Sequence, residues 1–421
     1  MAYSAEIIAV GTELLLGSIV NTNARDLSED LSGLGINVFY HTVVGDNPKR
    51  LRSAVEIARG RADIIITTGG LGPTYDDVTK EVLADCFGKA LVYHQEIGDR
   101  LRDFFAKRVP GQAMSENNLR QAYFPEGSTV LENQKGTAPG CAFFAGGKHV
   151  IMLPGPPREC RPMFREAVIP YLKAMRDGEI LSHNIHIFGM GESAVEDRLK
   201  DFMAGLCNPS LAPYAKTGEV TLRVTAHAES AEEAEALMEP VLQRVCETLG
   251  DVIYGIDAES LEATVIRLLL AQKKTIATAE SCTAGLLSKR LTDIPGASEA
   301  FLGAVVAYAN ETKTKFLGVE EALLNQAGAV SEPVARAMAE GVRERMGTDF
   351  GIGITGIAGP GGGSVEKPVG TVFVALAMAG ETFVRRLNLG TDRSRVRIMA
   401  VQHALDMLRR QMTGKAMAIN N

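Results

Sequence analysis

The sequence predicts a protein of the α/β class with more than one domain. Short, almost entirely apolar runs such as ADIIITTGG (62–70) alternate with segments whose apolar residues recur at helical spacing. This alternation is typical of a parallel sheet buried between helices. Glycine-rich stretches follow two of the apolar runs, and 421 residues exceed what one ordinary hydrophobic core holds. We therefore expect two or three α/β domains.

The first domain is expected over residues 1–170, with a mainly parallel sheet. Its elements are the strand candidates 5–11, 37–45 and 62–70 and the helical segments near 20–33 and 48–59. Gly146-Gly147 predicts a hairpin turn, and Pro157 predicts the start of a helix, because proline suits the first helical turn.

Residues 171–255 have a different pattern, which predicts a small βαββαβ module without a catalytic cluster. We interpret this module as a spacer or a dimerisation element. Residues 256–421 begin again with a helix and a strand, and they end in a long helix from about Asp392. They predict a second, independent α/β domain.

Composition limits the classes of function. The formal net charge is −7, tryptophan is absent, and the six cysteines are scattered without a CxxC pair. The acidic charge and the lack of tryptophan argue against a base-stacking nucleic-acid surface, and the cysteines argue against a zinc ribbon. No apolar run reaches the roughly 18–20 residues that span a bilayer. We expect a cytoplasmic protein with no membrane or nucleic-acid partner.

A glycine-rich loop follows the third predicted strand. The stretch TTGGLGPTYDDVTK (67–80) turns through Gly69, Gly70 and Gly72 and then reaches Asp76 and Asp77 at an expected helix start. Glycines let backbone N–H groups approach a phosphate, and a helix N-terminus favours the same anion. Two carboxylates suit a divalent cation that bridges to pyrophosphate oxygens. Helix capping by the two aspartates is the alternative interpretation.

Acidic residues also follow the first two predicted strands. Glu13 lies in GTELLLG and Asp46 in VVGDN. Open parallel sheets bind ligands beyond the carboxyl ends of their strands, so we expect Glu13, Asp46, Asp76 and Asp77 to converge. The four carboxylates are the candidate metal ligands.

The stretch TIATAESCTAG (275–285) predicts a strand that runs directly into a helix, with Ser281 at the junction. A serine there is exposed, and the backbone N–H groups of Cys282 or Thr283 would hold an oxyanion. The only histidine of the third domain, His403, stands in a helix, which argues against a Ser-His-Asp triad. Cys282 either packs as a small apolar group or has a lowered pKa at the helix N-terminus.

Lysine is the alternative base for Ser281. AYANETKTKFLGV (307–319) places Tyr308, Asn310 and Lys313 at the end of a strand and in the following helix. A lysine base must be neutral, so its pKa must fall well below the reference value of about 10.4. Burial or a nearby cation such as Arg393 or Arg397 would lower it. An ordinary helix cap and solvated basic side chains are the alternative.

A second glycine-rich loop is predicted after the strand in DFGIGITGIAGPGGGSVEKPVG (349–370). Thr355, Gly356, Gly359 and Ser364 are candidates to cradle a phosphate there. A flexible surface loop is the alternative interpretation.

Five motifs in the first domain resemble those of the CinA family (competence/damage-inducible protein A): GTELLLGSIVNTNA, VVGDN, TTGGLGPTYDDVT, ENQKGTAPG and LPGPPRE. That family's first domain is similar to molybdopterin-binding proteins. The resemblance implies hydrolysis of ADP-ribose to AMP and ribose 5-phosphate with a divalent metal ion (Mg, Mn or Co). It implies that Asp76 and Asp77 bind the metal ion and the phosphates, and that Gly69, Gly70 and Gly72 form the phosphate-binding loop. It adds Asn117, Arg120 and Lys135 as ligand contacts, with loop hydrogen bonding and surface charge as the alternative.

The third domain also resembles CinA, through AESCTAG, AYANETK, GAVSEPV, TGIAGPGGGSVEKPVGT and GTDR. This domain is similar to the free-standing PncC-type amidohydrolases. The resemblance implies deamidation of nicotinamide mononucleotide to nicotinate mononucleotide and ammonia, without a cofactor. It makes Ser281 the nucleophile, Lys313 its base, Tyr308 a proton-relay or ring-positioning residue and Arg393 a lysine-tuning or phosphate-binding group. Ala284 stands where the family pattern leads us to expect glycine.

Together these features predict a homodimeric, bifunctional nucleotide hydrolase of NAD recycling. Two alternatives remain open. In the first, the first domain binds or adenylates a pterin instead of hydrolysing ADP-ribose. In the second, the chain is a non-catalytic factor for competence or recombination. The acidic net charge argues against direct DNA contact.

Overall fold

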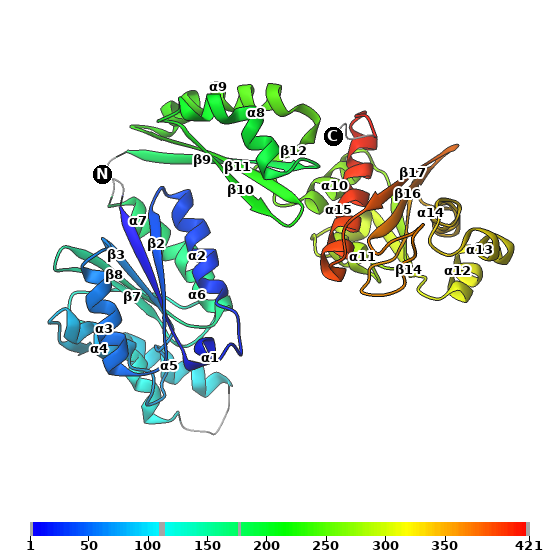
Figure 1. The fold of residues 1–421 in the computed structure, drawn as a ribbon. Helices are drawn as coiled ribbons and strands as arrows, with labels where there is room; N and C mark the ends of the chain where they lie inside the picture. The colour runs from blue at the N-terminus through cyan, green and yellow to red at the C-terminus, as the bar shows by residue number, and fades with distance from the viewer. Residues whose placement is uncertain (1–2, 109–113, 176–177, 418–421) are drawn as a thin grey trace. The chain divides into compact units, whose positions relative to one another are not determined.

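The computed structural model describes residues 3–108, 114–175 and 178–417, and the chain forms two compact units (Figure 1). The first unit contains the chain up to Leu181 together with His227–Ala234. The second contains Ser182–Ala226 and the chain from Glu235 onwards. No helix in the described ranges is long and apolar enough to cross a bilayer.

The first unit is built on a six-stranded sheet with the order β2-β1-β3-β8-β7-β6. Strands β1, β2, β3 and β8 are parallel, and β7 and β6 continue the sheet in antiparallel fashion. The prediction of a mainly parallel sheet is confirmed. The strands are β1 Ser4–Val10, β2 Asn37–Val44, β3 Ile64–Thr68, β6 Thr129–Leu131, β7 Gly140–Ala145 and β8 Lys148–Leu153.

Helices cover both faces of this sheet, because successive strand residues point to opposite faces. Ile7 packs in a core with α2 (Thr22–Gly33) and α6 (Pro157–Met163). Its neighbour Ile8 packs in the other core, with α3 (Pro48–Arg59), α4 (Thr79–Cys86) and α5 (Gln95–Arg108). Smaller elements complete the unit: α1 Thr12–Leu15, β4 Leu91–Tyr93, β5 Tyr123–Pro125, the 3₁₀ helix Glu116–Ala122, the π turn Phe164–Val168 and α7 Ile169–Lys173.

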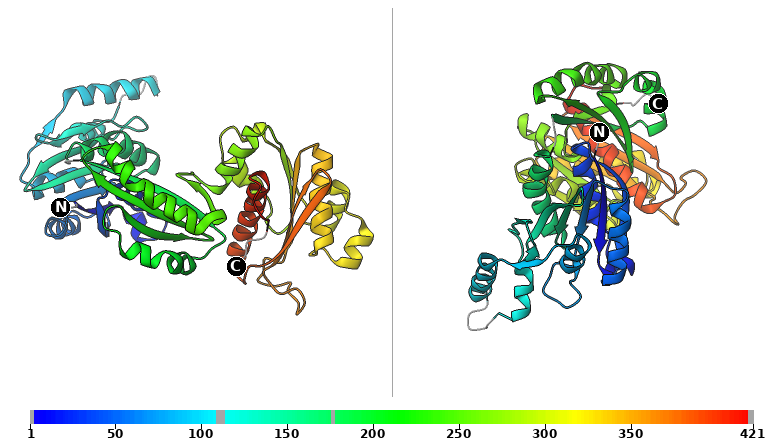
Figure 2. Two further views of the ribbon diagram at one scale, coloured as in Figure 1. Left: turned by 90° about the horizontal axis from the view of Figure 1, so that it is seen from above. Right: turned by 90° about the vertical axis from the view of Figure 1, so that its left-hand side faces the viewer.

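The middle module has the predicted βαββαβ order, and its strands form one sheet in the order β10-β11-β9-β12. Along β11, the buried residues Val220, Leu222 and Val224 alternate with the more exposed Thr221 and Arg223. The helices α8 and α9 lie on one side of the sheet (Figures 1 and 2). The elements are β9 Glu179–Phe188, α8 Glu192–Ala204, β10 Ser210–Lys216, β11 Glu219–Ala228, α9 Ala231–Leu249 and β12 Ile253–Ile256.

The C-terminal domain has a five-stranded sheet with the order β14-β13-β15-β16-β17. Strand β13 is parallel to both of its neighbours, and β16 and β17 are antiparallel additions. The carboxyl ends of β13, β14 and β15 therefore lie at one edge of the sheet. The strands are β13 Ile276–Glu280, β14 Phe301–Val306, β15 Phe350–Gly356, β16 Thr371–Met378 and β17 Glu381–Asn388.

Glycines let one helix approach this sheet closely. A Cβ atom on Gly351 would lie 2.2 Å from the Ala339 carbonyl of α14 (Glu332–Met346), and one on Gly353 would lie 2.5 Å from the Ala335 carbonyl. The FGIGIT pattern of β15 therefore places its small residues under α14 and its isoleucines in the core with α15. The remaining helices are α10 Leu261–Ala271, α11 Leu286–Thr292, α12 Asn310–Leu317, α13 Glu321–Ala327 and α15 Arg393–Met412.

Candidate active sites

A pocket of about 370 Å³ lies beyond the carboxyl ends of β1 and β3, and we call it the glycine-loop pocket. The predicted convergence is confirmed, since the candidate carboxylates and the loop glycines all line it. These residues are Glu13, Asp46, Gly69, Gly70, Gly72, Asp76 and Asp77.

Close packing alone requires glycine at two positions of this loop. Gly69 has a φ of 102°, and a Cβ atom there would lie 2.1 Å from the Val10 carbonyl of β1. Gly70 has a φ of 68°, and its Cβ atom would lie 2.2 Å from Oγ1 of Thr79. A side chain at Gly69 would therefore separate the loop from β1, and one at Gly70 would separate it from the start of α4.

The two aspartates of the loop do not cap a helix. Helix α4 begins at Thr79, and its N-cap, Val78, makes no side-chain capping bond, so the predicted helix start at the aspartates is wrong. Instead, Oγ1 of Thr74 lies 2.5 Å from a carboxylate oxygen of each aspartate and shares its one hydrogen between them. The backbone N–H of Thr74 also donates to Asp77 at 2.9 Å. The hydrogen bond from Thr74 lowers the pKa of Asp76, so this carboxylate is ionised at neutral pH.

The carboxylates are suited to a divalent ion only in combination with a substrate. In the described part of the chain, no three His, Cys, Asp or Glu side chains are grouped to hold a metal ion. Asp46 is already engaged, since it accepts hydrogen bonds from the backbone N–H and Oγ1 of Thr12. Mg²⁺ commonly uses one or two carboxylates together with waters and substrate phosphates, and Asp76 and Asp77 fit that requirement.

The three weaker ligand candidates do not line the glycine-loop pocket. Arg120 donates to the carbonyls of Thr74 and Asp77 and to the Glu81 carboxylate, at 2.6, 3.3 and 2.9 Å, so it holds the loop from behind. Asn117 is exposed, and Lys135 lines a neighbouring pocket of about 380 Å³. Ligand contact by these residues remains a prediction.

Sequence reasoning did not single out Glu159, a fifth carboxylate in the same pocket. It follows β8, the strand next to β3, and accepts a hydrogen bond of 2.8 Å from Nδ2 of Asn133. A Cβ atom on Gly136 would lie 2.1 Å from its Oε2, so the Asn133–Gly136 turn folds over it. The strand-end rule applied to LPGPPRE would have found it.

A second pocket, of about 220 Å³, lies at the carboxyl ends of β13 and β15, and we call it the Ser281 pocket. The structure brings most of the predicted residues together there, although Ser281 and Lys313 are 32 positions apart in the sequence. Predicted residues that line it are Ser281, Cys282, Tyr308, Asn310, Lys313, Thr355, Gly356 and Arg393.

Ser281 lies in a tight turn and not at the start of a helix. Strand β13 ends at Glu280 and α11 begins only at Leu286, so the predicted direct junction is wrong. The fully buried Glu280 carboxylate accepts hydrogen bonds from the N–H groups of Leu287 and Ser288, at 3.0 and 2.8 Å. Glu280 therefore caps α11 and fixes the turn that presents Ser281.

Lys313 is 1% exposed and donates to the Ala307 carbonyl at 2.9 Å and to the Tyr308 carbonyl at 3.4 Å. Burial lowers the pKa of Lys313, as a lysine base requires. Lys313 and Ser281 line the same pocket, but in the described part of the chain their side chains share no hydrogen bond.

Cys282 has the properties of a packing residue. It belongs to the hydrophobic core that contains α11 and α15. Burial raises the pKa of its thiol to about 11, so the alternative of a lowered thiol pKa is wrong. At neutral pH the sulfur is a neutral thiol and a weak nucleophile.

Four other predicted residues are not on the wall of the Ser281 pocket. Arg397 donates to the Thr283 carbonyl at 2.8 Å, and so stabilises the turn after β13 without lining the pocket. The Gly359 carbonyl accepts a hydrogen bond of 2.7 Å from Arg393. Oγ of the exposed Ser364 accepts from the Lys367 N–H at 3.1 Å and closes a surface turn, so these loop residues form no cradle.

The turn also explains why glycine is expected at position 284. Ala284 has a φ of 50°, in the left-handed region that costs residues with a Cβ atom about 1 kcal/mol. We expect Ala284→Gly to raise the free energy of unfolding by about 1 kcal/mol, measured by urea denaturation. Ala322→Gly, on the exposed side of α13, is the control and should lose about 1 kcal/mol. A loss at both positions would contradict the strain at Ala284.

Comparison with known proteins gives matches along almost the whole chain. Residues 6–174 match the family model of a probable molybdopterin binding domain, residues 182–255 that of the damage-inducible protein CinA KH domain, and residues 258–412 that of the CinA C-terminal domain. A CinA-like protein of Dictyoglomus turgidum is 51% identical over 405 residues, which cover 96% of this chain and 98% of that protein.

A CinA-like protein of Kosmotoga olearia is 48% identical over 408 residues, covering 97% of this chain and 98% of that protein. Among solved structures, a competence/damage inducible protein from Agrobacterium tumefaciens is 40% identical with a TM-score of 0.35. That match covers 36% of this chain and 93% of the other.

Proposed function

The chain belongs to the CinA family, and on that premise we propose that its Ser281 pocket deamidates nicotinamide mononucleotide. The observation that carries the proposal is the meeting of a serine, a buried lysine, a tyrosine and an arginine at one pocket. These groups supply a nucleophile, a base of lowered pKa, a hydrogen-bonding ring and a phosphate partner. Carboxamide hydrolysis needs the first two.

The reaction begins with Ser281. Its Oγ attacks the carboxamide carbon and passes its proton to Nζ of Lys313. The carbon–nitrogen bond then breaks, and Lys313 returns the proton to the departing ammonia. Water attacks the resulting ester, releases the carboxylate and restores the Ser281 hydroxyl, again with Lys313 carrying the proton.

Backbone donors are available for the oxyanion of the tetrahedral intermediate. The N–H groups of Cys282 and Thr283 donate to no backbone carbonyl in the described ranges, whereas those of Ser281 and Ala284 do. Backbone N–H groups beside the nucleophile supply the stabilisation that such an intermediate requires. The Glu280 contacts with α11 keep these donors in place.

For the first domain we propose hydrolysis of the pyrophosphate bond of ADP-ribose to AMP and ribose 5-phosphate. Asp76 and Asp77 would hold a divalent ion together with the substrate's phosphate oxygens, and the ion would supply charge neutralisation. Thr74 and Arg120 hold the loop, so the carboxylates are oriented before the substrate binds. The alternative of pterin binding or adenylation predicts molybdopterin binding without this hydrolysis.

Metal removal separates the two proposed activities. Incubated with EDTA, the purified protein should lose ADP-ribose cleavage and keep deamidation of nicotinamide mononucleotide, because paired carboxylates line the glycine-loop pocket and no carboxylate is among the described residues that line the Ser281 pocket. Added Mg²⁺ or Mn²⁺ in excess should restore the cleavage, and liquid chromatography of the nucleotides measures both reactions.

Equal inhibition of both reactions by EDTA would contradict the metal-free deamidation. The absence of both reactions under all conditions, with DNA binding in a gel-shift assay, would favour the non-catalytic competence factor. A homodimer in the cytoplasm stays a prediction, which light scattering of the purified protein and cell fractionation test.

A further inference from the structure

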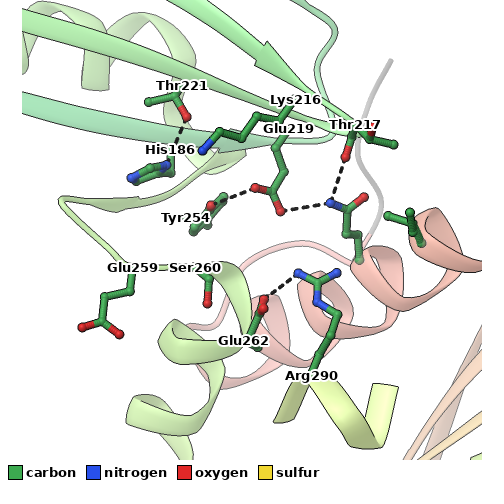
Figure 3. Close-up of a pocket in the computed structure, with 12 residues that line it drawn as sticks. His186, Lys216, Thr217, Glu219, Thr221, Tyr254, Glu259, Ser260, Glu262 and Arg290 are labelled. Atoms are coloured by element: carbon green, nitrogen blue, oxygen red, sulfur yellow. Dashed lines mark hydrogen bonds and ion pairs between the residues drawn. The ribbon is translucent and has the colours of Figure 1, made fainter. Parts of the chain in front are cut away.

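A third pocket, of about 430 Å³, lies within the second unit and has no part in either proposed reaction (Figure 3). One wall is the polar face of the middle module's sheet, with His186, Lys216, Glu219 and Tyr254. The opposite wall belongs to the C-terminal domain, where α10, α11 and α15 contribute. We call it the module pocket.

The sheet wall of the module pocket holds a carboxylate whose side-chain hydrogen-bond donors, within the described residues, are both neutral. Glu219 accepts from the Tyr254 hydroxyl at 3.2 Å and from Nε2 of Gln402 at 3.0 Å. Burial raises the pKa of Glu219, although the charge of Arg290 opposes this shift. A cationic group of a ligand would stabilise the ionised form of this carboxylate.

Side chains with nitrogen donors line both walls of the same pocket. Lys216 makes no ion pair within the described ranges, and its side chain extends toward His186 in Figure 3. Nδ1 of His186 faces Oγ1 of Thr221 at 3.2 Å, and the ring stacks on Tyr254 with centroids 5.5 Å apart. On the opposite wall Arg290 uses one nitrogen for Glu262, at 2.5 Å.

The charged side chains that line the module pocket indicate which kind of ligand it binds. Glu219, Glu259 and Glu262 line the pocket together with two cations, Lys216 and Arg290, and burial lowers the pKa of His186, so this ring is neutral at pH 7. A simple dianion would be repelled by three carboxylates. A molecule with a cationic part for Glu219 and an anionic part for Lys216 meets both requirements.

We propose that the module pocket binds a zwitterionic small molecule of about mononucleotide size, with its cationic ring beside Glu219 and Tyr254 and its phosphate beside Lys216. The pocket volume is ample for such a ligand and far exceeds that of a phosphate ion.

Two helices connect the module pocket with the Ser281 pocket. Helix α15 contributes Arg393 to the Ser281 pocket and Gln402 to the module pocket. Helix α11 is capped by Glu280 beside Ser281, and its residue Arg290 lines the module pocket. A ligand that pulls Arg290 or Gln402 toward the sheet therefore acts on the two helices that hold the turn containing Ser281. Through these helices the module pocket is an effector site for the Ser281 pocket.

Calorimetric titration with nicotinamide mononucleotide tests the proposal, which uses the proposed substrate only as a probe of suitable charge and size. The full chain carries Ser281→Ala to prevent turnover, and EDTA excludes metal ions. We expect Lys216→Gln and Glu219→Gln each to weaken one binding event at least 10-fold. The control Lys200→Gln, an exposed lysine of the same module, should change nothing.

Two binding events in the parent, one of them sensitive to the module-pocket variants, would support both proposals. A single event that these variants weaken would support the module pocket and contradict substrate binding at Ser281. Titrations that are unchanged in both Lys216→Gln and Glu219→Gln would overturn the inference. Hydrogen exchange supplies a second readout, since the probe should slow exchange in α11 of the parent and not of Lys216→Gln.

Discussion

Replacing Ser281 by alanine is expected to lower kcat for deamidation of nicotinamide mononucleotide by at least about 10³-fold, because it removes the atom that attacks the carboxamide. The neighbouring Cys282→Ala change should keep activity within about 10-fold. Its buried thiol has a raised pKa and packs in the core, so its loss removes contacts and no nucleophile. Ammonia release in a coupled assay measures both variants.

Comparing Ser281→Ala with Cys282→Ala distinguishes which of the two side chains is the nucleophile. Both substitutions lie in the turn between β13 and α11, and both replace a small side chain with alanine, so a general disturbance of the turn would affect the two alike. Full activity of Ser281→Ala together with loss in Cys282→Ala would transfer the nucleophile to the thiol. A loss in both variants with unchanged circular dichroism would show that the turn tolerates no change.

The second large effect is expected at Asp406 in α15. Its fully buried carboxylate binds Arg409 at 2.6 and 2.9 Å and Arg410 at 2.7 Å, and both guanidinium groups are almost completely buried. Asp406→Asn leaves two buried cations without a counter-charge. We expect a loss of about 3–5 kcal/mol in the free energy of unfolding.

Urea unfolding followed by circular dichroism measures this loss, since the chain has no tryptophan for fluorescence. The matched control is Asp197→Asn in α8, whose carboxylate pairs with Lys200 on the surface and whose loss should change the free energy of unfolding very little. The two arginines also donate to the carbonyl of Asp251 in the middle module, so Asp406 holds the module against α15. A loss below about 1 kcal/mol for Asp406→Asn would contradict this role.

The elements of the fold were predictable because local patterns determine them. Apolar runs with glycine at their ends became β1, β3 and β15, and α15 begins directly after Asp392, close to its predicted start. The starts of α4 and α11 were predicted too early, by two and five residues. At α4 the two aspartates bind Thr74 within the loop and do not cap the helix. At α11 the cap comes from Glu280 at the end of the strand, so the residues between them form a turn before the helix begins.

The sequence by itself determined which strand ends carry chemistry, because the carboxyl ends of parallel strands share an edge. Glu13, Asp46 and Ser281 each follow a strand, and Thr355 lies at the end of β15. Only the tertiary structure decided which neighbours line each pocket. Glu159 enters the glycine-loop pocket because β8 lies beside β3, and Arg397 is excluded from the Ser281 pocket because it supports the turn from behind. The module pocket had no sequence signal at all, since its walls come from elements whose contact depends on packing between two modules.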